Sequence, residues 1–418
     1  MQKIKSNTDY VPLTLQEEII QLVREWSSKE KQGDINARLF AANRIKEFLV
    51  KTDDGTFTFK SESRGDSSET MHTTHGALSE ARQKFAEPAG INGKKSVSIL
   101  DICSGLGFNA AATLDTIGGI EFLMDDGLEY LEMDLVEISW ETLAASIIIP
   151  SPSESHEIVK KAIENYLILK GYLIFPAVET EIPDSVQIRV HCDDARKIIM
   201  NIPEIQKYDV VYLDPFSPAR TPELYSRELL SRVRSLLKDD GIILTYTSAA
   251  PVRYALLDAG LEVGEGPAMG RNGGTVASPL QKRIPKSLGD IDERMIALSD
   301  AGIPYRDPEF NLSSEKITEN RQVERMEIRG VSKLPSTVKT PIYLAMASDD
   351  VRQKRRVLKN LEKFNIDDLN SLKSRYLVCP QYSNCICNCG SGRLSTSRAR
   401  IMEMEKRLEI ITNGNFKN

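Results

Sequence analysis

The chain has 418 residues, of which 41% are hydrophobic and 27% charged, with 25 glycines and 19 prolines. This composition is typical of a globular protein and excludes fibrous and wholly disordered proteins. At about 150 residues per domain, the length predicts two or three domains, or one large α/β domain with additions.

No segment of the sequence predicts insertion into a membrane. Residues 1–7 are polar and lack the apolar core of a secretory signal. The longest apolar stretches, such as Ser146–Pro150, are far shorter than the roughly 20 residues that a spanning helix needs. We therefore expect a soluble, cytoplasmic protein with no membrane partner.

Charge is distributed unevenly along the chain. The formal net charge of −6 alone argues against a nucleic-acid partner. Residues 351–418, however, carry 14 Lys and Arg against 6 Asp and Glu, so this part has a net charge of +8 and the first 350 residues carry −14. A basic appendage on an acidic body favours contact with a nucleic acid, and the alternative is a solvated helical face.

The first part of the chain is predicted to form two helices and a hairpin. Apolar residues three and four positions apart predict helices at Leu13–Trp26 and Ala37–Val50. An Asp-Gly pair beside alternating apolar residues predicts a hairpin over Thr52–Phe59, followed by a polar loop at Ser61–Ser68. These elements make up a first region, residues 1–68.

Strands and helices then alternate over about 190 residues, which predicts a doubly wound, mostly parallel, Rossmann-like α/β sheet. The run Tyr208–Leu213 is apolar on both faces, as a central parallel strand should be. The predicted strands are Val97–Cys103, Tyr130–Ile138, Val186–Cys192, Tyr208–Leu213 and Gly241–Tyr246. The predicted helices are Asn109–Thr116, Glu157–Lys170, Pro222–Leu237 and Pro251–Ala259.

The pattern changes beyond Pro285. A rigid turn at Pro304–Pro308 precedes a charged helix predicted at Ser313–Arg329, and Ile342–Met346 has the composition of a strand. The expected divisions after the first region are a core domain at 69–290, a segment at 291–345 and a basic, cysteine-containing tail at 346–418.

A glycine loop follows the first strand of the core. Gly105 and Gly107 allow a sharp turn and a close approach of the backbone to a ligand at the start of a helix. The third glycine of the dinucleotide pattern is absent, since Ala110 stands three residues after Gly107. With Asp101 leading the loop, the pattern fits the nucleoside of S-adenosylmethionine (AdoMet) better than NAD, and a tight structural turn is the alternative.

Acidic residues end the next strands. Glu137 is placed to bind ribose hydroxyls, although it lies about 30 residues past Gly107 instead of the usual 20 or so. Asp193 and Asp194 follow the third strand, where they are placed to meet an adenine. Each acid alone is typical of a solvated strand end, but acids at successive strand ends indicate a shared crevice.

The sequence Leu-Asp-Pro-Phe-Ser-Pro at 213–218 ends the buried strand and is similar to the Asp/Asn-Pro-Pro-aromatic loops of amine methyltransferases. Asp214 and the carbonyl of Pro215 are placed to accept the N–H groups of an amine, and Phe216 offers a wall that tolerates a sulfonium. A free alkylamine has a pKa near 10, so burial must lower it, and Asp214 would take the departing proton. A rigid proline turn is the alternative.

Histidine and cysteine clusters complete the candidate sites. The motif Glu69-x-x-His72-x-x-His75 has no obvious third metal ligand, so we interpret it as a loop that lines the cleft and hydrogen-bonds to substrate or AdoMet. Four of the six cysteines occur within eleven residues: Cys379, Cys385, Cys387 and Cys389.

In a cytosolic protein such crowded cysteines favour a metal over disulfides. Thiolates suit zinc or an iron–sulfur cluster. The spacing differs from paired C-x2-C knuckles, and it would require alternate residues of an extended strand to hold one tetrahedral ion. Reduced thiols on a flexible tail are the alternative.

Together these motifs resemble the methyltransferase module of the MnmC-type family, which completes 5-methylaminomethyl-2-thiouridine at the wobble position of tRNA. The resemblance covers about Tyr10 to Glu327 and leaves no room for a separate flavin oxidase domain, which implies a standalone form. The matching motifs lie at 52–57, 69–82, 103–109, 194–196, 213–225, 245–253, 267–271 and 302–308.

The resemblance implies a class I AdoMet-dependent methyltransferase fold and methyl transfer to the amine of aminomethyl-uridine in the anticodon region of tRNA. It implies that Asp214 binds and deprotonates the amine, with Pro215 and Phe216 beside it. The residues expected to hold AdoMet are Asp101, Gly105, Gly107, Asn109, Glu137, Asp193, Asp194 and Glu80. The residues expected to contact the substrate are His72, His75, Ser217, Arg253 and Arg271.

Two other functions stay open. A polyamine aminopropyltransferase has a similar sheet and acidic pocket but uses decarboxylated AdoMet and typically two pocket aspartates. The third possible function is that of an AdoMet-fold RNA-binding protein without catalysis. Asp214 and the glycine loop argue against it. Residues 330–418 lie outside the family pattern, and Asn272-Gly273-Gly274 replaces its usual basic run. The identity of the tRNAs, the thiolation of the uridine and the oligomeric state stay open.

Overall fold

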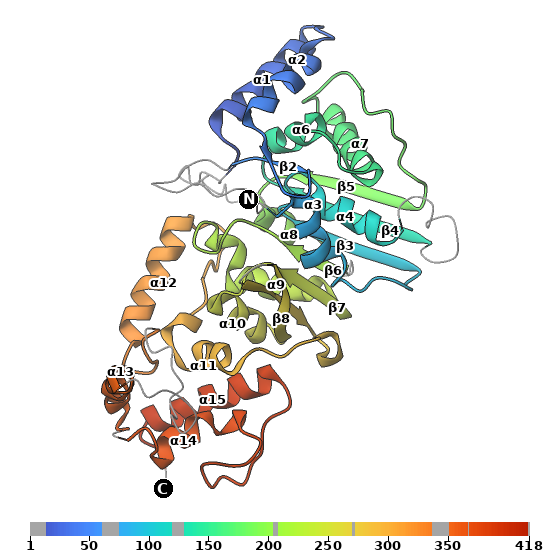
Figure 1. Cartoon of the computed structure of the whole chain (residues 1–418). Coiled ribbons are helices and arrows are strands. Elements are labelled where there is room, and N and C mark those ends of the chain that lie inside the picture. Colours follow the sequence, from blue (N-terminus) through green and yellow to red (C-terminus); the bar gives the residue numbers. More distant parts are fainter. Residues whose placement is uncertain are drawn as a thin grey trace, which may run out of the picture. The chain divides into compact units, whose positions relative to one another are not determined.

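The computed structural model describes residues 14–60, 75–118, 129–203, 208–269, 272–336, 351–366 and 368–416. The chain divides into two compact units, each made of several segments (Figure 1). The first unit comprises Met1–Leu224, Ser235–Tyr246 and Gly266–Gly274, and the second comprises Tyr225–Arg234, Thr247–Glu265 and Thr275–Asn418. The four-part division expected from sequence patterns stays a prediction.

The N-terminal elements agree with the predicted helices and hairpin, with shifted ends. The face of the first helix that carries Ile19, Val23 and Trp26 is fully buried, as its apolar spacing requires. Val50 leaves the predicted helix and pairs with Thr58 in the hairpin. The elements are α1 (Glu17–Lys31), α2 (Ala37–Arg44), η1 (Ile45–Phe48), β1 (Val50–Lys51) and β2 (Phe57–Thr58). The predicted loop at 61–68 lies outside the described residues.

A seven-stranded sheet has the order β5-β4-β3-β6-β7-β9-β8 (Figure 1). The neighbours from β5 to β7 pair in parallel, which confirms the predicted doubly wound sheet. The strands are β3 (Ser96–Ile102), β4 (Tyr130–Glu137), β5 (Val186–Cys192), β6 (Tyr208–Leu213), β7 (Leu237–Thr245), β8 (Glu262–Met269) and β9 (Asn272–Ser278).

The strand order reverses between β3 and β6. From β3 the chain proceeds outward to β4 and β5, then returns to the other side of β3 for β6 and β7. Open α/β sheets bind ligands in the crevice at such a reversal, beyond the carboxyl ends of the strands. The loops after β3 and β6 meet there, since the backbone N–H of Asp214 donates to the carbonyl of Ile102 at 3.1 Å.

The helices of the first unit include one that the apolar spacing did not reveal. Helix α6 begins after Ser139, whose hydroxyl accepts a hydrogen bond from the backbone N–H of Thr142 at 3.1 Å. It packs against α1 and α7, and α7 also packs against α4 and β5. The helices are α3 (Ala77–Ala81), its π-helical continuation η2 (Arg82–Ala86), α4 (Phe108–Thr116), α6 (Trp140–Ile148), α7 (Glu154–Leu169) and α8 (Ala195–Asn201).

The remaining helices show two differences from prediction. The single helix expected over 222–237 is two helices, and the strand expected from Gly241 begins at Leu237. The helices are η3 (Pro222–Tyr225), α9 (Arg227–Leu236), α10 (Ala250–Asp258), η4 (Gln281–Arg283), α11 (Asp290–Leu298), η5 (Asp300–Gly302), α12 (Ser314–Ile328), α13 (Val351–Leu361), η6 (Glu362–Phe364), α14 (Leu372–Val378), η7 (Cys379–Gln381) and α15 (Ser397–Thr412).

The C-terminal tail is folded over its described residues, which contradicts the alternative of thiols on a flexible tail. Ile401, Met404 and Leu408 of α15 are buried at 0–1% exposure. The strand-like stretch 342–346 lies outside the described residues. In the part of the chain that the structure describes, no helix combines the length and apolar character needed to span a bilayer.

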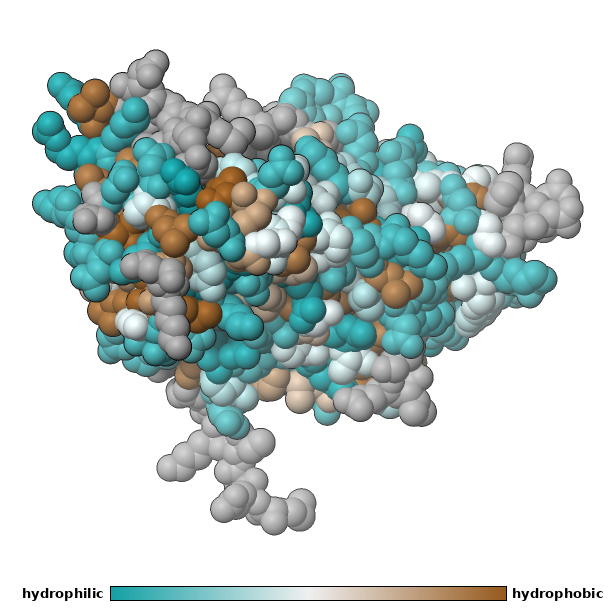
Figure 2. Space-filling view, turned by 90° about the horizontal axis from the view of Figure 1, so that it is seen from below, coloured by the Kyte–Doolittle hydropathy of each residue, from teal (hydrophilic) through white to brown (hydrophobic). Residues whose placement is uncertain are grey.

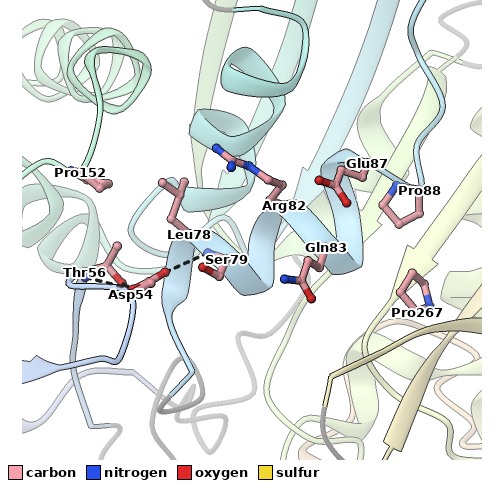
Figure 3. Close-up of a pocket in the computed structure, with 10 residues that line it drawn as sticks. All are labelled: Asp54, Thr56, Leu78, Ser79, Arg82, Gln83, Glu87, Pro88, Pro152 and Pro267. Carbon is pink, nitrogen blue, oxygen red and sulfur yellow. Dashed lines mark hydrogen bonds between the residues drawn. The ribbon is translucent and has the colours of Figure 1, made fainter.

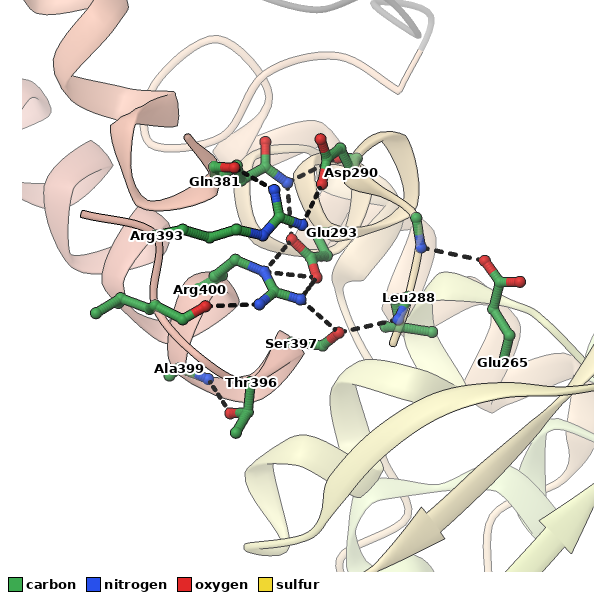
Figure 4. A network of polar contacts seen from close by, with 12 residues as sticks. Glu265, Leu288, Asp290, Glu293, Gln381, Arg393, Thr396, Ser397, Ala399 and Arg400 are labelled. Atoms are coloured by element: carbon green, nitrogen blue, oxygen red, sulfur yellow. Dashed lines mark hydrogen bonds and ion pairs between the residues drawn. The ribbon is translucent and has the colours of Figure 1, made fainter. Parts of the chain in front are cut away.

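A buried ion pair anchors α15 to α11 (Figure 4). The guanidinium of Arg400 donates to both carboxylate oxygens of Glu293, with N–O distances of 2.7–3.0 Å. Glu293 is 0% and Arg400 2% exposed. The side-chain amide of Gln381 also donates to Glu293, at 2.8 Å. Each charge is therefore compensated inside the second unit, and removal of one charged side chain would leave the other buried without its counter-charge.

We expect Glu293→Ala to lower the free energy of unfolding of the second unit by about 3–5 kcal/mol, because Arg400 would stay buried without its counter-charge. Urea denaturation followed by circular dichroism measures this change. The control is Glu319→Ala, which removes an exposed ion pair with Lys316 and should leave the free energy of unfolding nearly unchanged. Equal losses in the two variants would contradict the role of the buried pair.

Candidate active site

The loop after β3 is a turn that glycine makes possible. Cys103, Gly105 and Gly107 have φ values of 67°, 54° and 83°. The backbone N–H groups of Cys103 and Ser104 both donate to the carbonyl of Val136 on β4, at 2.9 and 3.0 Å. The loop then enters α4 at Phe108, so the helix N-terminus lies at the strand-order reversal.

Gly107 is required by space as well as by its backbone conformation. A Cβ atom at this position would lie 2.7 Å from Cγ1 of Val159 on α7. The absence of a side chain therefore lets α4 and α7 pack closely at the mouth of the crevice. The sharp turn at Gly105 and Gly107 agrees with the prediction, and ligand binding by this turn stays a prediction.

His156 on α7 braces the glycine loop, and nothing in the sequence pattern singles it out. Its Nε2 atom lies 2.9 Å from the carbonyl oxygen of Leu106, and its ring stacks on Phe108 with centroids 4.8 Å apart. Burial, together with the charge of Lys160, lowers the pKa of His156 to about 4. The neutral ring therefore donates its Nε2–H to Leu106 at neutral pH.

Asn109 joins two carboxyl groups at the edge of the sheet. Its Nδ2 atom lies 3.0 Å from Oδ2 of Asp214 and 3.4 Å from Oδ1 of Asp101. Burial raises the pKa of Asp101 to about 7. The hydrogen bond from Asn109 lowers this pKa, and the charge of Glu137 raises it further. The amide thus ties the acid of the glycine loop to the acid that ends β6.

The pKa of Asp214 is held well above its ordinary value. Burial is the main cause, and the nearby carboxyl groups of Glu80 and Asp101 raise it further. The hydrogen bond from Asn109 and the charge of Lys84 act in the opposite direction. A carboxylate in this state accepts a proton more readily than an ordinary aspartate does.

Glu80 and Lys84 form an ion pair one helical turn apart on α3 and η2, and both are at most 9% exposed. The Nζ atom of Lys84 also lies 5.6 Å from the ring centroid of Tyr246. Phe85 packs edge-on against Tyr212 of β6, with centroids 5.5 Å apart, which fixes this helical segment against the sheet. The segment thereby supplies one negative and one positive charge that act on Asp214.

Two buried oxygen atoms of the glycine loop region have no hydrogen-bond partner among the described residues: Oδ2 of Asp101 and Oγ of Ser104. Glu137 accepts from the backbone N–H of Gly105 at 3.1 Å and keeps its carboxylate at the end of β4. Unsatisfied buried polar atoms are costly unless a ligand meets them. These residues therefore fit a polar nucleoside such as that of AdoMet.

The two aspartates after β5 differ in availability. Asp194 caps α8 by accepting from the backbone N–H of Arg196 at 2.9 Å, and it also pairs with the buried guanidinium of Arg196. Asp193 pairs with Lys197 at 3.1 Å, and its side chain is 49% exposed. Asp194 thus has a folding role, and of the two Asp193 is the better candidate to meet an adenine.

Two of the expected substrate residues, His75 and Ser217, lie in described parts of the first unit. His75 is 58% exposed, with Nδ1 3.9 Å from Asp53. The carbonyl of Ser217 accepts from the backbone N–H of Arg220 at 2.8 Å, which closes the turn after β6. Both stay candidates for substrate contact. His72 and Arg271 lie outside the described residues.

Arg253 and the four cysteines belong to the second unit. Arg253 is 2% exposed, and its guanidinium bonds to Asp292 at 2.6 Å and to Thr275 at 3.0 Å. These contacts hold Arg253 in the fold, and its contact with a substrate stays a prediction. The sulfur atoms of Cys379, Cys385, Cys387 and Cys389 lie within 4.8 Å of one another.

A cavity of about 660 Å³ lies along one face of α3 and η2 (Figure 3). Leu78, Ser79, Arg82 and Gln83 share this face at helical spacing, whereas Glu80 and Lys84 lie on another face. The other lining residues are Asp54, Thr56, Glu87, Pro88, Pro152 and Pro267. Neither Asp214 nor the glycine loop lines this cavity, so it is distinct from the edge of the sheet where Asp214 lies.

Asp54 connects the hairpin to α3 at the border of the cavity. Its carboxylate accepts from the backbone N–H of Ser79 at 3.0 Å and from the side chains of Thr52 and Thr56 at 2.9 and 2.7 Å. Burial alone would raise the pKa of Asp54, but hydrogen bonds from Thr56, Ser79 and Thr52 lower it to about 2. The hairpin is thus attached to α3, the helix that carries Glu80.

The pKa of His156 predicts a pH dependence of stability. The unfolded chain binds a proton at this histidine below about pH 6.5, whereas the folded chain does so only below about pH 4. The free energy of unfolding should therefore be unaffected above pH 6.5 and fall by about 3 kcal/mol between pH 6.5 and 4. His156→Gln, which keeps a donor for Leu106, should lack this part of the pH dependence in urea titrations. An identical slope in both proteins would contradict the assignment.

Comparisons with known proteins agree with this geometry. The family described as S-adenosyl-L-methionine-dependent methyltransferase matches residues 153–279. The crystal structure of MNMC2 from Aquifex aeolicus superposes with a TM-score of 0.53, at 23% identity, over 76% of this chain and 94% of that chain. This likeness supports the class I methyltransferase fold that the sequence resemblance implied.

Two relatives extend the comparison. The bifunctional MnmC protein of tRNA 5-methylaminomethyl-2-thiouridine biosynthesis from Ralstonia nicotianae is 25% identical over 213 residues, which are 49% of this chain and 30% of that protein. The uncharacterized protein MJ0670 of Methanocaldococcus jannaschii is 34% identical over 355 residues, which are 85% of this chain and 91% of that protein. The chain therefore belongs to the same family as MJ0670, and it carries an S-adenosyl-L-methionine-dependent methyltransferase domain.

Proposed function

We propose that this protein is a tRNA N-methyltransferase that converts the aminomethyl group of the modified wobble uridine to methylaminomethyl. The observation that carries the proposal is Asp214, a carboxylate of raised pKa at the end of β6, held by Asn109 beside the glycine loop. The 25% identity to a bifunctional MnmC protein supports tRNA as the substrate class.

The cofactor would lie on the glycine loop. Gly105 and Gly107 give the backbone its close approach, and Glu137 is in place for ribose hydroxyls. Asp101 offers its unpaired Oδ2 atom, and Asp193 is in place for the adenine. When bound, AdoMet supplies a methyl group on a positively charged sulfonium.

Asp214 would act on the amine of the substrate. The amine must lose a proton before its lone pair can form a bond, and Asp214 is the acceptor for that proton. Asn109 donates to Oδ2 of Asp214 and so holds this carboxyl group beside the glycine loop. Pro215 is buried and Phe216 half-buried, and the ring of Phe216 would form a wall beside a cationic sulfonium.

The test is methyl transfer from labelled AdoMet to bulk tRNA from cells that lack this protein, followed by nucleoside analysis. We expect label in methylaminomethyl-uridine. Asp214→Asn should lower the rate by about 10²–10⁴-fold, the range for loss of a general base, while AdoMet still binds. The control is Asp209→Asn, a buried aspartate at the opposite end of β6 that pairs with Lys94 and Lys238; it should lose stability but keep its rate when folded.

Other outcomes separate the alternatives. Transfer to a small diamine, with none to tRNA, would replace the proposal by a polyamine aminopropyltransferase. Binding of AdoMet with no transfer to either substrate would indicate an RNA-binding protein without catalysis. A normal rate in Asp214→Asn would remove Asp214 from the chemistry.

The charge of Lys84 leads to a pH prediction for the same reaction. Only the deprotonated form of Asp214 accepts a proton, so the rate should rise with pH through the raised pKa of Asp214. Lys84 lowers that pKa, and Lys84→Met should therefore move the acid limb of the rate profile to higher pH. Lys84→Arg keeps the charge and should leave the limb nearly in place. A shift in the opposite direction in Lys84→Met would contradict this electrostatic role.

A further inference from the structure

The four C-terminal cysteines come from two places in the sequence that fold together. Cys379 begins η7 at the end of α14, and Cys385, Cys387 and Cys389 lie in the turns before α15. The sulfur atom of Cys379 lies 3.9 Å from that of Cys385 and 3.8 Å from that of Cys389, and Cys385 and Cys389 are 3.6 Å apart. All four cysteines are free.

The expectation that these cysteines would occupy an extended strand is wrong. Asn388 has a φ of 63° and Gly390 a φ of 74°, so the chain turns sharply on both sides of Cys389. With these turns the sulfur atoms of Cys385, Cys387 and Cys389, although on alternate residues, lie within 4.8 Å of one another and of Cys379. The obstacle to a tetrahedral site that the spacing suggested is therefore absent.

We propose that Cys379, Cys385, Cys387 and Cys389 bind one zinc ion that holds the C-terminal segment of the second unit together. Zinc in structural sites binds four ligands tetrahedrally, with Zn–S distances of about 2.3 Å. Sulfur atoms at the corners of such a tetrahedron are about 3.8 Å apart, by the geometry of that bond length. The three sulfur–sulfur distances of 3.6–3.9 Å match this spacing.

The same distances argue against an iron–sulfur cluster. In a four-iron cluster each cysteine binds a different iron atom, and in a two-iron cluster the cysteines divide between two irons. Both arrangements separate at least some thiolates by more than the edge of a single tetrahedron. Here all four sulfur atoms lie within 4.8 Å of one another, which is the spacing of ligands around one ion.

Arg407 of α15 lies beside the sulfur atoms and compensates their charge. Its Nη1 atom is 3.8 Å from Cys387 and its Nη2 atom is 3.6 Å from Cys389. Arg407 is 4% exposed and stacks on the ring of Tyr376 at 4.5 Å. Four thiolates around Zn²⁺ carry a net charge of −2, so a buried guanidinium donating to two of them stabilises the complex. The backbone N–H of Ile386 also donates to Cys379, at 3.4 Å.

The surroundings give the ion a structural role. Residues 382–396 contain no helix or strand, and polar contacts of Gln381 and Arg393 with Asp290 attach this segment to α11 (Figure 4). Hydrophilic side chains cover most of the face shown in Figure 2, with hydrophobic ones in small groups. In a stretch without helix or strand, a metal with four protein ligands and no open position can hold the chain.

Metal analysis of the full-length protein, purified without chelator, tests the proposal. We expect one zinc per chain and no iron or inorganic sulfide. The double variant Cys385→Ser/Cys389→Ser should lower the zinc content at least tenfold. The control is Cys192→Ser, which removes a cysteine in the first unit and should keep one zinc per chain.

Cobalt exchange on the unchanged protein covers the case in which the double variant does not fold. Co²⁺ should give the intense visible bands of a tetrahedral tetrathiolate site, and added Zn²⁺ should abolish them. A thiol reagent should modify the four cysteines only after chelator is added.

Three results would overturn the proposal. They are four reactive thiols with no bound metal, iron with sulfide in place of zinc, and cysteines found as disulfides by mass spectrometry. None of these readouts depends on methyl transfer, so they leave the proposed function to its own test.

Discussion

The parallel pairing of β3 with β6 is the constraint on which the candidate active site depends. Ile99 lies opposite Val210 and Ile102 opposite Leu213, so the two strands end side by side. Each strand is followed at once by its polar residues, and Asn109 bridges the two loops by bonding to Asp101 and Asp214. A shift of register between these strands would separate the glycine loop from Asp214, although no residue of either loop had changed.

This arrangement concentrates carboxyl groups in a region of low polarity. Asp101, Glu137 and Asp214 all have raised pKa values, for which burial is the main cause. Lys84 is the cation that opposes the rise at Asp214. An excess of buried acid is costly unless the acids are protonated or meet a positive ligand. A sulfonium and an alkylammonium are both positive, so the same electrostatic excess that destabilises the empty site would favour the proposed cofactor and substrate.

The sequence predicted the parts of this site that depend on local pattern. The apolar run of β6 and the glycines of 105–107 were visible because burial on both faces and positive φ select few residue types. Contacts between distant residues were not visible. His156 supports Leu106 across about 50 positions, and Arg253 is held by Asp292. Residue type showed that each was polar, but only the tertiary fold decides whether a polar side chain faces a ligand or a partner.

The folded tail changes how its positive charge should be interpreted. In α13, Val357 and Leu361 are buried, whereas Arg352, Lys354 and Arg355 are exposed. The basic run is therefore the outer face of a helix that has an apolar inner face. The two alternatives for this run, a solvated face and a nucleic-acid contact, are compatible, because a folded helix fixes several cations on one side where phosphates can meet them together.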